Sequence, residues 1–553
     1  MKFNRILSML AMAAGLFGCY SCVKVDATLG SDLIATNQLY DTYVVECPLQ
    51  DIQVRMADSL SGYSQTKMAI GAIRDEHGLS TRACAFPLVP FYDTLDFGKN
   101  AKFRSFYVNL RRDTTNFCDE SQKNILQNIN VYALEEDISS IYDINADVKH
   151  SAERITTSIP VFDGESDSIS FCLTKEFGEK YMQILQSDCD SISHFVKKYP
   201  GIYIDTDEPV GDGGRIDMFL CQLQYNSSSY YVDGNFASLN FTAEYDGVEK
   251  DTTFFFLFGA NDFLDVDSLV YNAVSTFPQY VLNLSTQESR SEAGPAGETF
   301  RVEGSGGLKP VISATEIQSL MKSEIGKYGD PDKAIINRAT IVLPFEFPEN
   351  YNDMDMYPEV MSPTCRIKSS DSDGGAVYTF ASLTDASSSD ENQGDINRSL
   401  CIYSPDITYH AQQLLSMDPT SEYFKNYDIW LLILKNEVTK SNDSNDGSSS
   451  SLSDYYTQLM YAQYYNNMMY GGYGYGSYGY SGYGYGSYGS NYYNYYLMNQ
   501  LYSSMYSSSS SSDEESETAL DLFRYYDAVF YGPEYPDPTK RPTLRLTFSI
   551  PKE

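Results

Sequence analysis

Short apolar or alternating runs, separated by Gly, Pro, Asp and Asn, fill most of the chain from residue 42 onward. They predict β-strands joined by turns, because alternate side chains of a strand point to opposite faces of a sheet. No regular alternation of strands with long helices accompanies them, so antiparallel sheets are favoured over a parallel sheet. In the first half of the chain the clearest runs are 103–110, 129–134, 169–173, 216–223, 239–245 and 254–258.

Two segments show the 3.6-residue period of an amphipathic helix instead. In the first, Thr174 precedes the apolar residues and is a candidate N-cap. The second segment repeats the same spacing at an offset of 230 residues. The apolar positions are Phe177, Tyr181, Ile184 and Leu185 in the first segment and Ile407, Ala411, Leu414 and Leu415 in the second.

The strands around these helices also correspond, which indicates an internal duplication. Segments 103–110, 170–173, 195–203 and 239–245 match 336–343, 400–403, 423–430 and 544–548. We therefore predict a mainly β protein of two tandem antiparallel β-sandwich (jelly-roll-like) modules, each with one short amphipathic helix. The predicted boundaries are 41–250 for the first module, 251–330 for a connecting β/helix segment and 331–553 for the second module.

The connecting segment contains a glycine-rich turn, 304–307, and a third helix that starts with the capping box Ser313 to Glu316. The predicted buried face of this helix is formed by Ile317, Leu320, Met321 and Ile325.

A low-complexity insert, 441–517, interrupts the second module. It contains 19 tyrosines, and the octapeptide Gly-Tyr-Gly-Tyr-Gly-Ser-Tyr-Gly occurs in it twice, at 472–479 and 482–489. Such a composition does not bury a packed core, so we predict a long disordered loop. An adhesive segment, in which tyrosine rings stack on sugars or on each other, is the alternative.

The first residues have the pattern of an export signal with a lipid attachment site. Lys2 and Arg5 precede an apolar run that ends at Leu16-Phe-Gly-Cys19. We predict a lipoprotein signal peptide, 1–18, lipid attachment at Cys19 with Cys22 as the alternative, and a polar tether, 19–40. The lipid would hold the protein on the outer membrane, and the sequence leaves open which leaflet it faces.

The charge and the motifs exclude several functions. With 39 basic and 75 acidic residues the net charge is −36, which argues against nucleic-acid binding. No G-x-S-x-G, H-E-x-x-H or phosphate-loop motif is present, and we expect no catalytic residue, metal or cofactor. The histidines, His77, His150, His194 and His410, are widely separated. The enzyme alternative is a glycan-active hydrolase that uses two carboxylates in a sandwich cleft.

One turn is a candidate binding site. Asp75 and His77 lie between Gly71 and Gly78, where the simplest reading is a tight turn that needs positive φ at Gly78. Eight cysteines follow the tether. Several lie in strand-like runs, where a free cysteine behaves as a small apolar residue, so disulfide pairing stays open.

With these residues in hand, the chain resembles a Bacteroidetes lipoprotein family, domain of unknown function 4270. The resemblance is carried by 29–34, by the glycines and aspartate of 71–78, by 302–307 leading into 336–343, and by 541–548. It implies an exported lipoprotein and brings no catalytic residues. His77 departs from the family's pattern, which has an aromatic residue there.

Exported proteins of these bacteria also suggest a modification motif, Asp-Ser/Thr followed by a hydrophobic residue or Thr. Its candidate O-glycosylation sites are Ser59, Thr94, Thr114, Ser168, Ser191, Thr252 and Ser268. Together these observations predict a non-catalytic envelope lipoprotein whose β-sandwich surfaces bind glycans or other envelope proteins. The alternatives are the hydrolase described above and a surface-assembly protein that acts through its Tyr/Gly loop.

Overall fold

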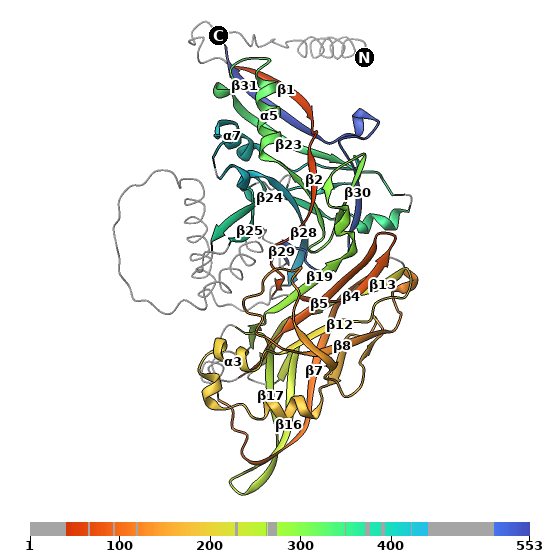
Figure 1. Ribbon diagram of the computed structural model, residues 1–553, viewed down its shortest axis with the longest axis vertical. Helices are drawn as coiled ribbons and strands as arrows, with labels where there is room; N and C mark the ends of the chain where they lie inside the picture. The colour runs from red at the N-terminus through yellow and green to blue at the C-terminus, as the bar shows by residue number, and fades with distance from the viewer. Residues whose placement is uncertain are drawn as a thin grey trace, which may run out of the picture.

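The protein is mainly β, with several antiparallel sheets. The computed structural model describes residues 40–64, 67–91, 94–117, 120–226, 231–260, 263, 274–348, 350–370, 376–388, 393–421, 423–440 and 514–552. The predicted signal peptide and tether up to residue 39, with Cys19 and Cys22, lie outside these residues, as does most of the tyrosine-rich insert. Figure 1 shows an elongated molecule with two groups of strands, one above the other.

The lower group in Figure 1, called the first unit, runs from residue 63 to residue 287. Its elements are β3 (Tyr63–Ser64), β4 (Lys67–Asp75), β5 (Gly78–Phe86), β6 (Leu88–Pro90), β7 (Lys99–Phe117), η3 (Glu120–Gln122), β8 (Gln127–Leu134), β9 (His150–Arg154), β10 (Val161–Phe162), β11 (Ser168–Cys172), α2 (Lys175–Tyr181), η4 (Gln186–Asp190), α3 (Ile192–Lys198), β12 (Ile202–Thr206), β13 (Gly213–Leu220), β14 (Gln222–Asn226), β15 (Tyr231–Gly234), β16 (Phe236–Tyr245), β17 (Val248–Phe258), β18 (Val274–Pro278) and β19 (Val281–Gln287).

The upper group, called the second unit, combines the first two strands with residues 294–551, and η5 (Glu288–Glu292) joins the two units. Its elements are β1 (Tyr40–Pro48), β2 (Ile52–Met56), β20 (Gly294–Pro295), β21 (Thr299–Glu303), β22 (Leu308–Ile312), α5 (Ala314–Ile325), η6 (Pro331–Lys333), β23 (Ile335–Pro344), η7 (Tyr351–Met356), β24 (Val360–Ser370), β25 (Ala376–Ser382), α6 (Thr384–Ser388), β26 (Ile396–Asn397), β27 (Ile402–Tyr403), α7 (Thr408–Ser416), η8 (Phe424–Tyr427), β28 (Ile429–Lys440), β29 (Glu514–Leu520), β30 (Asp527–Tyr531), η9 (Pro538–Lys540) and β31 (Thr543–Pro551).

The same pattern of strand pairing occurs in both units. In the first, β7 pairs with β11, β13 and β16, and β12 pairs with β5 and β8. In the second, β23 pairs with β27 and β31, Phe345 just after β23 forms a bridge to Phe530 of β30, and β28 pairs with β22 and β24. Among the described residues no strand of one unit pairs with a strand of the other. This repetition agrees with an internal duplication.

A shared irregularity in the strand register supports the duplication. Phe106 of β7 faces Leu239 of β16, and Ala339 of β23 faces Leu546 of β31. In β7, the residue two positions before Phe106 is left out of the pairing with β16. In β23, the residue two positions before Ala339 is left out of the pairing with β31. A β-bulge is a local irregularity of strand pairing, so its recurrence at matching positions supports the correspondence of the two units.

The helices also correspond, but one turn away from the predicted alignment. The N–H of Leu173 donates to the carbonyl of Phe106 at 2.7 Å, and the N–H of Ile407 donates to the carbonyl of Ala339 at 2.8 Å. Ile407 therefore matches Leu173, whereas the sequence pattern matched it to Phe177. Positions four apart share a helix face, so the apolar pattern does not distinguish these alignments.

The first strands belong to the second unit. β1 pairs with β31 along nine residues, as β17 pairs with β16 in the first unit. β2 pairs with β22, as β19 pairs with β5. The two strands that complete the second unit, β1 and β2, therefore come from the start of the described chain. The corresponding strands of the first unit, β17 and β19, come from the end of that unit. The predicted boundary at residue 41 assigned these strands to the first module, because local patterns carry no information about pairing over such distances.

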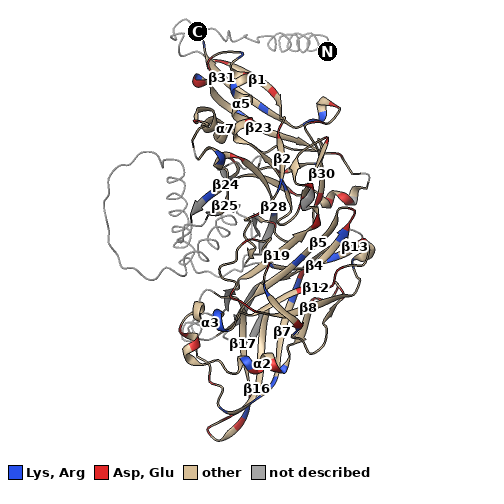
Figure 2. Ribbon diagram, in the orientation of Figure 1, with Lys and Arg blue, Asp and Glu red and all other residues tan. Residues whose placement is uncertain are grey.

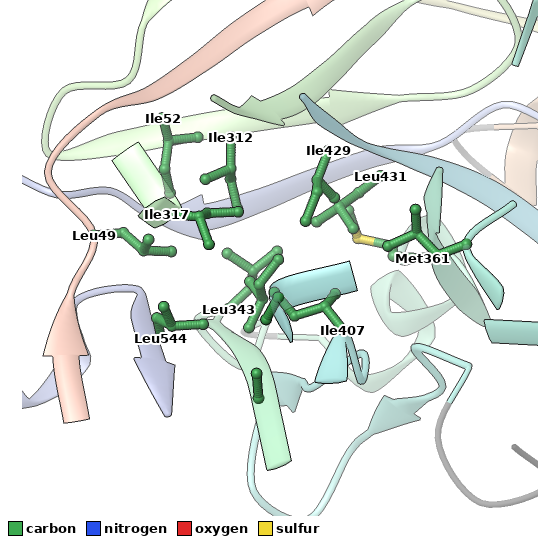
Figure 3. Close-up of a cluster of buried hydrophobic side chains, with 14 of the residues drawn as sticks. Leu49, Ile52, Ile312, Ile317, Leu343, Met361, Ile407, Ile429, Leu431 and Leu544 are labelled. Atoms are coloured by element: carbon green, nitrogen blue, oxygen red, sulfur yellow. The ribbon is translucent and has the colours of Figure 1, made fainter. Parts of the chain in front are cut away.

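The hydrophobic core of the second unit shows the same arrangement. Leu49 and Ile52 contribute to one cluster with Ile317, Leu343 and Leu544, and all five are buried. Figure 3 shows Leu49 and Ile52 beside the side chains of the later strands and of α5. A separate cluster fills the first unit, and a third cluster joins the two units, with Ala69, Ile73 and Met218 on one side and Val311, Trp430 and Leu432 on the other.

The predicted helix starts are confirmed, and the predicted ends are less accurate. The hydroxyl of Thr174 accepts from the N–H of Phe177 at 3.4 Å, and that of Ser313 accepts from Glu316 at 3.1 Å. The Glu316 carboxylate does not close the capping box, because it accepts from the N–H of Gln50 at 2.8 Å. The predicted helix over 177–185 ends at Tyr181, and a separate helix, α3, follows it in the first unit.

Some predicted burial and insert positions also differ. Leu185 is exposed because it lies in the turn before η4, and Leu320 of α5 is only half-buried. The last four residues of the predicted insert, 514–517, form the start of β29, which pairs with β28. Among the described helices, none has the length and apolar character needed to cross a bilayer.

Candidate functional site

The described residues form a polar pocket where the two units meet, and we call it the seam pocket. It is small, with free space of about 10 Å³, roughly what one water molecule needs, and it is partly open to solvent. The first unit and η5 contribute Asp75, His77, Gly78, Leu79, Ser80, Arg82, Gln287 and Ser289, and the second unit contributes Glu303, Gly304, Tyr525 and Tyr526. Both predicted candidates, Asp75 and His77, therefore line it.

The turn between β4 and β5 places Asp75 and His77. The Asp75 carboxylate accepts from the N–H of His77 at 2.7 Å, which closes the turn. Gly78 has φ of +115°, and a Cβ there would lie 2.6 Å from the Glu288 carboxylate, so the turn requires glycine as predicted. The His77 ring lies 3.1 Å from a Glu292 oxygen, so it contacts η5.

A second hairpin turn supplies the opposite wall. Residues 304–307 join β21 to β22, and the helix follows only after β22. The ammonium of Lys309 holds this turn by donating to the carbonyls of Glu303, Ser305 and Gly307 at 2.5, 3.0 and 3.3 Å. Burial lowers the pKa of Lys309 to about 7. Its hydrogen bonds to the turn give this residue a role in the fold.

The carboxylates of the pocket are held by protein donors. Asp75 accepts from the hydroxyl of Tyr525. Glu303 accepts from the hydroxyl of Ser289 at 2.8 Å and from the N–H of Leu308 at 3.3 Å, and it also pairs with Arg301 at 3.3 Å.

Behind the wall, a buried carboxylate fixes the segment that carries the two tyrosines. Asp521 accepts from the hydroxyl of Tyr526 at 2.8 Å and pairs with Arg524 at 2.9 Å. Burial opposes the ionisation of Asp521, but Arg524 and two backbone N–H groups outweigh it and lower the pKa of this carboxyl.

Two other side chains have polar atoms without partners. Arg82 is 2% exposed, and its Nη1 donates to Ser80 Oγ at 3.2 Å and to the carbonyl of Thr81 at 2.8 Å, whereas its Nε has no partner among the described residues. Burial lowers the pKa of Arg82 to about 10. Gln287 has no partner in the described structure for either atom of its buried amide. Outside the pocket lining, six further described residues also have a buried polar atom without a partner: Asn116, Gln127, Asn130, Tyr181, Ser305 and Arg366.

Sequence reasoning missed Arg82, Gln287, Glu303 and the two tyrosines. One available signal was the position of Arg82, the one charged residue of strand β5. Gln287 reaches the pocket through the pairing of β19 with β5. Glu303 and the two tyrosines reach it only through the contact between the units, which no local pattern reveals.

The predicted modification sites differ in accessibility. Thr94, Thr114, Ser168 and Ser191 are exposed, and Thr252 is half-buried. Ser59 is also half-buried, and its hydroxyl accepts from Arg366 at 3.1 Å. Ser268 lies outside the described residues. O-glycosylation stays a prediction at all seven positions.

Among the described residues, the cysteines and acidic groups form no further site. Cys47, Cys84, Cys221 and Cys365 are buried and unbridged, and burial raises the pKa of Cys47 to about 11. Cys172 and Cys401 are unbridged as well, and Cys118 lies outside the described residues. In the described part of the chain, no three His, Cys, Asp or Glu side chains gather as a metal site. Figure 2 shows acidic and basic residues interspersed along both units.

Comparisons with protein-family models, with curated proteins and with solved structures each gave no match.

Proposed function

We propose that this protein is a non-catalytic lipoprotein of the bacterial outer membrane, attached through Cys19, that binds a glycan or another envelope component at the junction of its two units. The export pattern of the first residues supports the location. The observation that supports binding is the position of the two predicted candidates, Asp75 and His77, which both lie where the units meet.

The proposal includes membership of the Bacteroidetes family that the sequence resembles and a fold of two tandem sandwich modules. The repeated pairing of β7 and β23 with corresponding neighbours supports such modules. Their boundaries would follow the pairing, with β1 and β2 in the second module.

A glycan-active hydrolase is the second candidate, because Asp75 and Glu303 line one pocket together with tyrosines. The hydrogen bonds favour binding over hydrolysis. A catalytic carboxylate must reach the glycosidic oxygen or the anomeric carbon, whereas both of these carboxylates already accept hydrogen bonds from protein groups.

Attachment is tested by growing cells with labelled fatty acid and isolating the wild type and the Cys19→Ala and Cys22→Ala variants. We expect label in the wild type and in Cys22→Ala, and none in Cys19→Ala. Label retained by Cys19→Ala would move the attachment site to Cys22.

Binding is tested by applying the detergent-solubilised full-length protein to a glycan array and by measuring release of reducing sugar from every glycan that binds. We expect binding without release. Release that disappears in Asp75→Asn and Glu303→Gln would establish the hydrolase instead.

A further inference from the structure

We infer that β1 is a self-association strand. Its free edge pairs antiparallel with β1 of a second copy of this chain, and Val44 of one copy lies opposite Val44 of the other. The inference concerns a partner of the protein and does not depend on the proposed glycan binding.

The first step concerns the free edge. Among the described strands β1 pairs with β31 alone, along all nine of its residues, whereas the opposite edge of this sheet is the two-residue strand β26. Figure 1 shows β1 at the rim of the upper group of strands. An edge strand presents a row of backbone N–H and C=O groups, and another strand satisfies them.

The pairing with β31 determines which residues of β1 face the free edge. The N–H of Leu49 donates to the carbonyl of Pro542 at 3.0 Å, and these two residues continue the register of β1 and β31, so they form a hydrogen-bonded pair. Hydrogen-bonded pairs of an antiparallel ladder recur at every second residue. The odd-numbered residues of β1 therefore bond to β31, and Thr42, Val44 and Glu46 direct their N–H and C=O groups to the free edge.

The backbone of β1 is complementary to itself in one antiparallel register. When two copies overlap along the whole strand, Val44 lies opposite Val44, and Thr42 of each copy lies opposite Glu46 of the other. Each of these three residues then donates to the second copy and accepts from it. Pro48 has no N–H to donate, and in this register it lies opposite Tyr40, where the pairing ends.

The apolar side chains fit the same register. Val44 is 68% exposed in a single copy, so the pairing removes apolar surface from water. On the other face of the sheet, Tyr43 lies opposite Val45 of the second copy. Aromatic and β-branched residues that face each other across two strands stabilise the pair.

The charged side chains select this register. Asp41 lies opposite Cys47 of the second copy and Glu46 lies opposite Thr42, so no like charges meet. A register centred on Glu46 would instead oppose two carboxylates, which is destabilising.

The proposed lipid attachment is compatible with this pairing and favours it. The two strands run in opposite directions, so their Tyr40 residues lie about 30 Å apart. Residues 20–39 connect Cys19 to Tyr40 and reach at most about 70 Å. Both copies are therefore able to attach to one membrane, where their shared surface raises the effective concentration of each copy for the other.

The test places charges at the centre of the pair. The full-length wild type, Val44→Asp and Val44→Lys are purified in detergent, and their dimer dissociation constants are measured by sedimentation equilibrium. We expect a wild-type dimer, and each variant alone should dimerise at least about tenfold more weakly, because like charges lie directly opposite each other. An equal mixture of the two variants should form a heterodimer, since the opposed charges then attract.

Val248→Asp is the matched control. Val248 is the first residue of β17 and is 56% exposed, so this variant adds the same charge to an exposed strand of the first unit. It should dimerise as the wild type does. The thermal transition of Trp430, which lies in the second unit, shows whether each variant is folded.

Three outcomes would overturn the inference. A wild type that stays monomeric at about 100 μM forms no dimer with a micromolar dissociation constant. A dimer that Val44→Asp leaves intact uses another surface. A mixture of the two folded Val44 variants that stays monomeric shows that the two Val44 side chains do not face each other.

A second pair of variants tests the register if a Val44 variant loses the Trp430 transition. Position 42 lies opposite Glu46 of the second copy, so Thr42→Lys should strengthen the dimer and Thr42→Glu should weaken it. Equal dimer dissociation constants in these two variants would contradict the register.

Discussion

Replacing Leu49 by alanine tests whether the first strands stabilise the second unit. Leu49 lies between β1 and β2, is 0% exposed, and packs beside Ile52 and Leu544 (Figure 3). Truncating a fully buried leucine removes its burial and leaves a cavity, at a cost of about 2–5 kcal/mol. The backbone bond from Leu49 to the carbonyl of Pro542, 3.0 Å long, is retained in the variant.

The chain contains one tryptophan, Trp430, and its fluorescence reports on the second unit. It lies in β28 and is 3% exposed. For a unit of this size, each kcal/mol shifts the melting temperature by roughly 2–4 °C, so Leu49→Ala should lower the Trp430 transition by about 5–15 °C. The matched control is Val44→Ala in β1, where the side chain is 68% exposed and a change of at most about 2 °C is expected.

The result that refutes this reasoning is a Trp430 transition in Leu49→Ala that coincides with that of Val44→Ala. The first strands would then contribute no more to the second unit than an exposed surface position does.

Two further predictions concern stability. Burial lowers the pKa of His410 to about 4, below its ordinary 6.5, so the folded state binds its proton less well than the unfolded state, and stability is lost as pH falls through this window. Between pH 7 and pH 5 this lowers the free energy of unfolding by about 2 kcal/mol. Urea unfolding at several pH values should show no such loss in His410→Gln, whereas the exposed control His194→Gln should still show it. The same dependence of the unfolding free energy on pH in both variants would contradict the assignment to His410. Gly71 has φ of +146°, and a Cβ there would lie 2.2 Å from the carbonyl of Arg215, so Gly71→Ala should lower the melting temperature by several degrees. Gly211→Ala, with open space around it, is the control, and equal melting temperatures would show that the strand accommodates the methyl group.

Local features of the fold were readable from the sequence because they depend on neighbouring residues. The alternation over 103–110 predicted a strand that the structure extends to Lys99–Phe117. The N-caps at Thr174 and Ser313 and the glycine at position 78 follow from backbone requirements within a few residues. The predicted capping box at Glu316 does not form, because the carboxylate of Glu316 accepts from Gln50, which is far away in the chain.

The seam pocket was only partly predictable for the same reason. Asp75 and His77 were noticed through their turn, and the glycines of 304–307 through theirs, but nothing in either motif indicates that the two turns face each other. That arrangement depends on the apolar contact between the units, in which Ile73 and Trp430 take part. Gln287 ends β19, whose sequence has no feature that indicates a site.

The pairing of β1 with β31 determines the order in which the protein is able to fold. The hydroxyls of Thr42 and Ser549 lie 2.9 Å apart although 507 positions separate them in the chain. During synthesis, β1 and β2 emerge first among the described strands and have no partner until β22 and β31 follow, whereas the first unit has all its strands by residue 287. Contacts over such distances form slowly, and unpaired strand edges aggregate. The first unit therefore folds early, and β1 and β2 must be kept from pairing with other chains until the second unit is complete.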